Sequence, residues 1–185
     1  MKSKTTPNQE NPFLRFQMAL AFVGLNSKHI PINAQEPVEA LVIEIPSLAL
    51  RPAFQMHLVY FNDIQTLVFP EQKKDQDTLA WKLQFSLELP IKLSEQYSQE
   101  VSELLMFLNH ISTLGHFHSV QKQLFFSYRL LSEQRQLFPP LVVRCVRLIV
   151  QFIDLTYPML VQVESGKQTA KATIEKFQKR VQAST

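Results

Sequence analysis

The chain has 185 residues, of which 45% are hydrophobic and 19% are charged, values typical of one folded domain with a sizeable core. Its formal net charge is +3 at pH 7, but five basic residues follow Gly166, against Glu175 alone. Residues 12–166 carry 12 basic and 14 acidic side chains, which excludes a uniformly basic body. We expect a polar N-terminal tail over 1–11, a single domain over 12–166 and a basic C-terminal tail over 167–185.

The one cysteine, Cys145, lies in an apolar run and cannot form an internal disulfide. A buried structural thiol is the expected state, since a reactive thiol needs an exposed, electropositive setting. The N-terminus is polar, and the apolar stretch behind it is interrupted by Arg15 and Gln17, so no signal peptide is indicated. The sequence predicts a cytoplasmic protein.

Helix and strand patterns follow one another along the first half. Asn11-Pro12 is typical of a helix start and Gly24 of a stop, which predicts a helix of about 12 residues. Residues 28–37 contain two prolines and are expected to form a loop. Strand patterns follow at 38–45, 56–60 and 65–69, with Asn62-Asp63 as a turn. The clearest strand is 81–89, where apolar and polar residues alternate strictly, and the polar run 71–78 is the expected connection to it.

The second half begins with a helix that we expect Ser94 to cap and Gly115 to close. Two short strands are predicted at 117–120 and 124–131, around Gln121-Lys122. Pro139 and Pro140 open a long apolar helix that we expect to bend near Pro158 and to stop by Gly166. The tail is expected to form a short helix with Ile174, Phe177 and Val181 on one side.

The resulting order is helix, three or four strands, helix, two strands, long helix. Runs of strands between helices favour an α+β fold with a mostly antiparallel, twisted sheet flanked by helices. The strict alternation at 81–89 agrees, because antiparallel sheets commonly bury one face and leave the other in water.

Leu141 to Val163 is long enough to span a membrane. It carries a polar stripe, however, with members three and four residues apart: Arg144, Arg147, Gln151, Asp154 and Pro158. Charges at these positions are costly in a bilayer, so we expect a helix of a protein core and no membrane span. Two interpretations of the stripe stay open: a solvent-facing side with local ion pairs, or a contact for an anion or a partner.

The motifs of common enzymes are absent from the sequence. Phosphate-cradling loops need clustered glycines, but Gly24, Gly115 and Gly166 lie far apart. We predict no catalytic residues, no cofactor and no enzyme activity. His110, His116 and His118 are weak candidates for metal ligands, with Glu103 as the nearest carboxylate by sequence; the alternative is exposed histidines at the ends of elements.

One family resemblance rests on the segment Leu108-Asn109-His-Ile-Ser-Thr-Leu-Gly115-His-Phe117, the strand 124–131 and a long helix containing Tyr157-Pro158. In these features and in element order over residues 12–166, the chain resembles the YbjN-like family of bacterial proteins. That family is similar in fold to class I type III secretion chaperones. The resemblance implies a homodimer and a chaperone-like role, and it supplies no catalytic residues.

The preferred functional interpretation is a non-catalytic protein-binding module, chaperone-like or adaptor-like, which holds a partner protein through apolar surface or a sheet edge. The alternative is nucleic-acid or anionic-surface binding through the basic C-terminal tail. The weak candidates for partner contacts are Arg144, Arg147, Lys171, Lys179 and Arg180.

Overall fold

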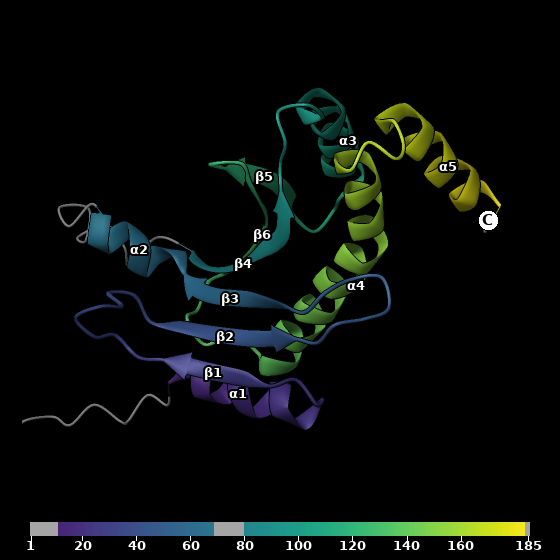
Figure 1. Ribbon diagram of the computed structural model, residues 1–185. Helices are drawn as coiled ribbons and strands as arrows, with labels where there is room; N and C mark the ends of the chain where they lie inside the picture. The colour runs from purple at the N-terminus through teal and green to yellow at the C-terminus, as the bar shows by residue number, and fades with distance from the viewer. Residues whose placement is uncertain (1–10, 69–79, 184–185) are drawn as a thin grey trace, which may run out of the picture.

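The computed structural model describes residues 11–68 and 80–183, without the side chains of 65–67. In chain order the elements are α1 (Pro12–Phe22), β1 (Ser27–Ile30), β2 (Ala40–Ile45), β3 (Phe54–Tyr60), α2 (Phe61–Val68), β4 (Trp81–Lys92), α3 (Ser98–Ile111), β5 (His116–Val120), β6 (Gln123–Ser132), α4 (Pro139–Glu164) and α5 (Ala170–Gln182). The strands form one sheet in the order β1-β2-β3-β4-β6-β5, and every pairing is antiparallel. The predicted α+β class, with an antiparallel sheet flanked by helices, is confirmed (Figure 1).

The core lies between one face of the sheet and the helices α1, α3 and α4. Strand residues at every second position are buried on this face, among them Leu41, Ile43, Met56, Leu58, Leu83, Phe85 and Leu87. They meet the buried sides of the helices, which include Phe13, Phe16, Leu104, Leu108, Val146, Ile149 and Ile153. In Figure 1, α4 runs from α1 at the bottom to α3 at the top, so this one helix joins both ends of the core.

Several elements that were predicted from hydrophobic periodicity or from a capping residue are present in the structure. Asn11 caps α1, because its side chain accepts a hydrogen bond from the Phe13 amide at 2.9 Å. The strand predicted at 81–89 is β4, which continues past Pro90 with a shift of register against β6. The strands predicted at 117–120 and 124–131 are β5 and β6, and the tail forms the predicted helix, α5.

Several local predictions are wrong. Asn62-Asp63, expected as a turn, lies inside the helix α2, and α3 ends at Ile111 with Ser112 as its C-cap rather than at Gly115. Residues 28–37 were expected to be a loop, but 27–30 form the edge strand β1, paired to β2 with Lys28 opposite Val42. The expected strand at 65–69 falls in α2 up to Val68, while Phe69 and the predicted loop 71–78 lie outside the described residues. Ser94 does not cap α3: its amide donates instead to the Glu164 carboxylate at 3.0 Å, and the helix begins at Ser98.

The long helix α4 is continuous from Pro139 to Glu164 through Pro158. By length and composition alone it is apolar enough to cross a membrane, with a mean hydropathy of 1.3 over 18 residues. In the structure one side of it packs into the core, where residues such as Val142, Ile149, Ile153 and Leu160 are buried. The predicted polar stripe lies on the other side, with Arg144, Arg147 and Gln151 exposed.

A charged cluster holds the end of the sheet near the start of α1. The Glu39 carboxylate accepts a hydrogen bond from the side-chain NH2 of Asn11, and His29 Nε2 lies 2.8 Å from a Glu39 oxygen. Arg135 lies between two carboxylates, 3.1 Å from Asp63 and 3.7 Å from Glu39. Burial raises the pKa of Asp63, although the Arg135 charge opposes the shift. The cluster thus ties α1, β1, α2 and the segment before α4 to one point.

The turn between α4 and α5 is a Schellman motif. The Lys167 amide donates to the Gln162 carbonyl and the Gly166 amide to that of Val163, both at 3.0 Å. Gly166 adopts a positive φ of 68°. Beyond it, the Ala170 amide at the start of α5 donates to the Glu100 carboxylate of α3 at 2.6 Å. The C-terminal segment is therefore a helix docked on α3.

Candidate protein-binding surface

A tight turn between β2 and β3 reaches across the outer side of α4. Leu48 and Arg51 form a two-way backbone pair, with N···O distances of 2.8 and 3.1 Å. Prolines at 46 and 52 flank this pair, and they favour a turn because proline fixes φ and donates no amide hydrogen bond. The turn places Leu48 and Leu50 in solvent, at 55% and 74% exposure.

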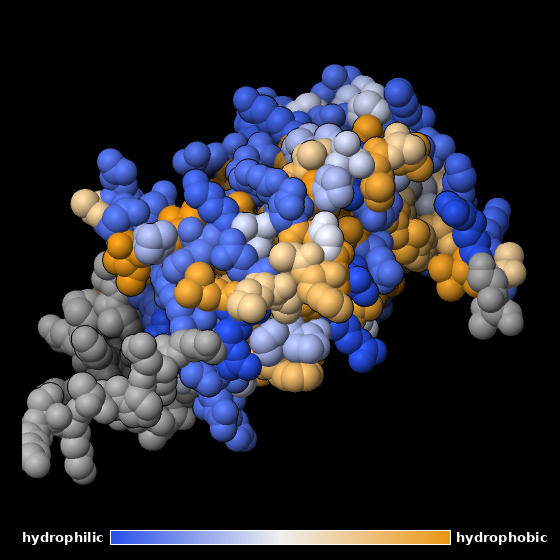
Figure 2. Space-filling view, turned by 90° about the horizontal axis from the view of Figure 1, so that it is seen from below, coloured by the Kyte–Doolittle hydropathy of each residue, from blue (hydrophilic) through white to orange (hydrophobic). Residues whose placement is uncertain are grey.

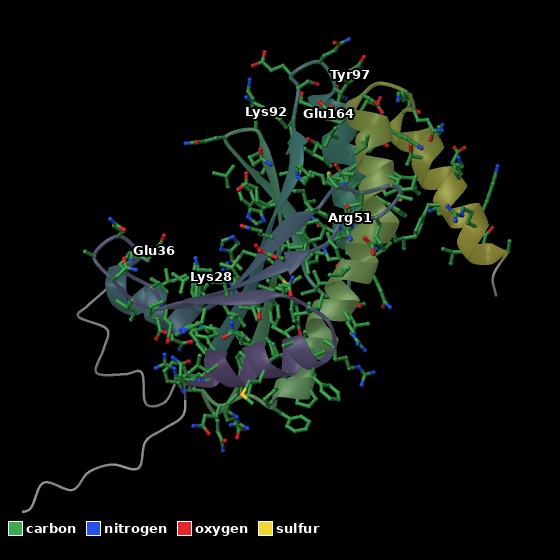
Figure 3. The ribbon with its side chains drawn as sticks, turned by 60° about the horizontal axis from the view of Figure 1, so that its bottom comes forward. Lys28, Glu36, Arg51, Lys92, Tyr97 and Glu164 are labelled. Atoms are coloured by element: carbon green, nitrogen blue, oxygen red, sulfur yellow. The ribbon has the colours of Figure 1, made fainter. Side chains whose placement is uncertain are left out.

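Arg51 fastens this turn to α4. Its side chain is buried, and its Nε donates to the Asp154 carboxylate, which lies 103 residues away in the chain. A second guanidinium nitrogen donates to the Pro52 carbonyl at 2.8 Å, and the guanidinium carbon lies 4.5 Å from the centre of the Phe54 ring. Figure 3 shows Arg51 beside α4. Because Arg is planar and holds several donors, it can satisfy all three contacts at once.

Two hollows flank the turn along α4. We call the first the Val150 hollow: it measures about 440 Å³, and its walls include Val23, Leu25, Leu48, Val146 and Val150. We call the second the Leu155 hollow: it measures about 290 Å³ and lies between α4 and α5, with walls that include Leu50, Leu155, Pro158, Met159 and Phe177. The Val150 hollow is lined mainly by apolar side chains, whereas the walls of the Leu155 hollow combine these apolar residues with polar and charged ones. One leucine of the turn belongs to the wall of each hollow, Leu48 to the first and Leu50 to the second.

Basic side chains line the mouths of the two hollows. Arg147 lies at the Val150 hollow, whereas Lys176 and Arg180 of α5 lie at the Leu155 hollow. The one carboxylate among the lining residues is Asp154, and its charge is compensated by Arg51. The rim of this surface is therefore positive, although the folded body is nearly neutral.

A further hollow of about 480 Å³ lies beyond Ile45 and Pro46, towards the sheet edge. Its walls include the polar side chains Asn26, Glu44 and Gln55, and it does not reach α4. Although it is larger, its polar lining gives an apolar ligand less surface to bury than the hollows along α4.

The outer side of α1 adds an apolar strip. Leu14, Met18 and Phe22 recur every four residues and are exposed, Phe22 to 92%. The end of α1 leads directly into Val23, which lines the Val150 hollow. Figure 2 views the molecule from the side of α1 and shows hydrophobic atoms gathered in the middle of this face, with hydrophilic residues around them. A contiguous exposed apolar patch with a polar surround is typical of a site of interaction with another molecule.

The edges of the sheet are partly occupied by helix side chains. The Asn109 amide group on α3 bonds both backbone groups of Phe117 in β5: it donates to the carbonyl at 3.0 Å and accepts from the N–H at 2.6 Å. At the opposite edge, Gln17 of α1 donates to the Ser27 carbonyl of β1 at 2.7 Å. Covering an edge in this way reduces its capacity to pair with another strand.

The sequence-predicted partner residues divide into two groups. Arg147 and Arg180 line the hollows, whereas Arg144, Lys171 and Lys179 do not. Local ion pairing within the polar stripe is wrong for Asp154, because its partner is Arg51 of the turn. Leu48, Leu50 and Arg51 were missed, since a short segment between two prolines carries no helix or strand period that would distinguish it from an ordinary loop.

The predicted histidine cluster is only partly brought together. His116 and His118 project from the same side of β5, with ring centroids 5.4 Å apart, and His118 stacks on Phe125. Burial, with the neighbouring His116 second, lowers the pKa of His118. His110 and Glu103 are exposed on α3. Across residues 11–68 and 80–183, no group of three or more His, Cys, Asp or Glu side chains could hold a metal ion.

Cys145 is buried in α4. Burial raises the pKa of its thiol, and contacts with Tyr128 and Arg144 oppose this shift only in part. A raised pKa keeps the sulfur protonated at neutral pH and so disfavours nucleophilic attack.

The resemblance to the YbjN-like family, carried by residues 108–117 and by Tyr157-Pro158, stays a prediction. No protein-family model matches the chain, and neither a curated protein nor a solved structure matches it.

Proposed function

We propose that the chain is a protein-binding module that holds a segment of a partner protein across the Val150 and Leu155 hollows. The observation that carries the proposal is the turn between β2 and β3. Arg51 holds this turn against α4 through its bond to Asp154, while Leu48 and Leu50 of the same turn remain exposed beside the two hollows. Burying such leucines against a partner is favourable by about 25 cal/mol for each Å² of apolar surface removed from water.

The sequence left two modes open, an apolar surface or a sheet edge. The side chains of Asn109 and Gln17 already bond backbone groups at the two sheet edges, and β1 and β5 are short strands. Strand addition needs a run of free backbone groups. These features favour the hollows along α4 as the place where a partner is held.

A photo-crosslinking experiment tests this proposal. Replacing Leu50 by the photoreactive residue p-benzoylphenylalanine places the probe at the turn, between the two hollows. The matched control is the same replacement of Met106, which is 75% exposed on α3 and lines neither hollow. Irradiation in the native cells should give a discrete protein adduct at position 50 that is absent at position 106. Identical adducts at both positions, or none at position 50, would contradict the proposal.

Nucleic-acid or anionic-surface binding through the C-terminal basic residues is the alternative. Lys176, Lys179 and Arg180 line one hollow of about 400 Å³ on α5, which also contains Glu175. This mode is less favoured because Lys176 and Arg180 also belong to the walls of the Leu155 hollow, beside its apolar residues. Truncation at residue 167 is a poor test, since α5 packs on α3 through a Phe107–Phe177 ring contact at 5.8 Å. Charge reversal by Lys171→Glu with Lys179→Glu leaves the α3 contact in place and should strongly weaken any salt-sensitive binding of this kind and reduce its dependence on salt.

A chaperone-like role, a homodimer, a cytoplasmic location and the lack of enzyme activity remain proposals alongside this one. The exposed apolar surface and its fixed geometry support the first. The others rest on the sequence.

A further inference from the structure

The spacing of the two hollows restricts the conformation of any segment that fills both. The α4 residues that line the Val150 hollow fall between positions 146 and 151, and those that line the Leu155 hollow fall between positions 154 and 162. Their centres are therefore separated by about ten residues of α4, or roughly 15 Å at the helical rise of about 1.5 Å per residue. Two side chains that enter the hollows must come from points at a similar separation.

An extended segment meets this spacing with few residues. Side chains four positions apart in an extended chain lie on the same side and are separated by roughly 13 Å. A helix would need anchors about ten residues apart, and with a diameter of about 10 Å it would have to clear the turn that lies between the hollows. Leu48 and Leu50 are exposed on that turn. An extended chain is narrower than a helix and can pass over them, so it fits this surface better than a helix does.

The charges at the rim define the polar part of the occupant. Arg147 lines the Val150 hollow and Lys176 lines the Leu155 hollow, and neither has an ion-pair partner among the described residues. The lining carboxylate, Asp154, is bonded to Arg51. An acidic group at each end of the occupant would meet a basic one, whereas a basic occupant would be repelled at both ends.

We infer that the partner segment is an extended, acidic stretch of polypeptide with two large apolar side chains four residues apart, one in each hollow, and an Asp or Glu outside each of them. This inference rests on the proposed function and specifies its ligand. It excludes basic or purely apolar segments as good ligands.

Selection from a displayed library of random 12-residue peptides on the immobilised full chain tests the inference. Enriched peptides should carry apolar residues at positions i and i+4 with acidic residues outside them. Synthetic copies should bind the double variant Arg147→Glu, Lys176→Glu at least about tenfold more weakly. They should bind Lys171→Glu, Lys179→Glu nearly as well as the unaltered chain, because those two residues lie outside the hollows.

The outcomes separate the ligand from the site. Enriched peptides that are neutral or basic, or that bind the Arg147→Glu, Lys176→Glu variant unchanged, would overturn the acidic ligand; if their binding is lost in Leu155→Asp, the hollows stand. Peptides whose binding survives Leu155→Asp would overturn the site as well. A chain that sediments as a dimer, and as a monomer after Leu50→Asp, would assign the surface to a second copy and overturn the inference.

Discussion

Arg51 is the residue on which the position of the turn over α4 depends. It is 4% exposed and bonds Asp154, whose side chain keeps 29% exposure. A buried ion pair contributes little net stability, because desolvation offsets the attraction, but removing one partner leaves the other charge buried and uncompensated. The pair is therefore better understood as a device that fixes geometry.

We predict that Asp154→Asn lowers the free energy of unfolding by about 2 kcal/mol, less than for a fully buried pair because water reaches the carboxylate. Removing both charges, with Arg51→Met and Asp154→Leu, should bring the stability back to within about 1 kcal/mol of the unaltered chain. Urea unfolding of the three proteins measures both effects. Equal stability of Asp154→Asn and the unaltered chain would show that the pair is not formed in solution.

Tyr60 gives a residue-scale prediction about pH. Its hydroxyl is buried and donates to the Arg135 carbonyl. Burial raises the pKa of this phenol well above its ordinary value of 10.0, although the Arg135 charge opposes the shift. The unfolded chain therefore loses this proton at a lower pH than the folded chain does. The contribution of Tyr60 to the free energy of unfolding should therefore be fully present below pH 10 and should decrease as the pH rises beyond it.

Tyr60→Phe should remove this contribution. At neutral pH it costs about 1 kcal/mol, from the lost hydrogen bond. Between about pH 9 and pH 11 the variant should lose less stability than the unaltered chain. Tyr128 and Tyr157, whose pKa values burial also raises, remain in both proteins and cancel in the comparison. Equal losses of stability in the two proteins over this pH range would show that the Tyr60 phenol is not buried in solution.

At the scale of elements, the α4–α5 turn decides where α5 and half of the Leu155 hollow lie. Gly166 and Gly24 both have positive φ, 68° and 79°. A Cβ on Gly166 would lie 2.3 Å from the ring of Tyr97, whereas a Cβ on Gly24 would meet nothing within 4 Å. The two glycines thus share a backbone requirement and differ in packing.

Gly24→Ala should cost about 1 kcal/mol, the penalty of a left-handed conformation. Gly166→Ala should cost roughly 3 kcal/mol, because the methyl group also displaces the Tyr97 ring. In a Tyr97→Ala background, the cost of Gly166→Ala should fall to that of Gly24→Ala. Thermal or urea unfolding of this series gives the answer, and equal costs at the two glycines would contradict the crowding of Gly166.

A helix or strand could be predicted from the sequence where its apolar and polar residues recur with a clear period. In β4 the alternation of buried Leu83, Phe85 and Leu87 with polar residues is complete, and the strand is evident from the sequence. By contrast, β1 is a four-residue edge strand that exists through its pairing with β2. The helix α2 was mistaken for a strand because its fixed points are tertiary: the Asn62 side chain accepts from the Lys82 amide at 2.8 Å, and the Arg129 guanidinium carbon lies 4.2 Å from the Phe61 ring centre.

At the scale of the whole molecule, the candidate surface was only partly predictable. The polar stripe of α4 showed that Arg147, Asp154 and Pro158 share a side, and the structure lines the hollows with all three. The sequence could not place Leu50 against that stripe, because the contact depends on how the β2–β3 turn crosses α4. The local ion-pair interpretation failed for the same reason, since the partner of Asp154 comes from another element.

The central proposal is that the surface of the two hollows, rather than the sheet edge formed by β5 and its neighbour β6, holds a partner. Methyl NMR on the full chain, titrated with a peptide selected from the library, tests it most directly. The methyl signals of Leu48, Leu50 and Leu155 should shift, while those of Val120 and Leu131 on β5 and β6, also exposed, should stay in place. Shifts confined to Val120 and Leu131, with those of Leu50 and Leu155 unchanged, would contradict the account.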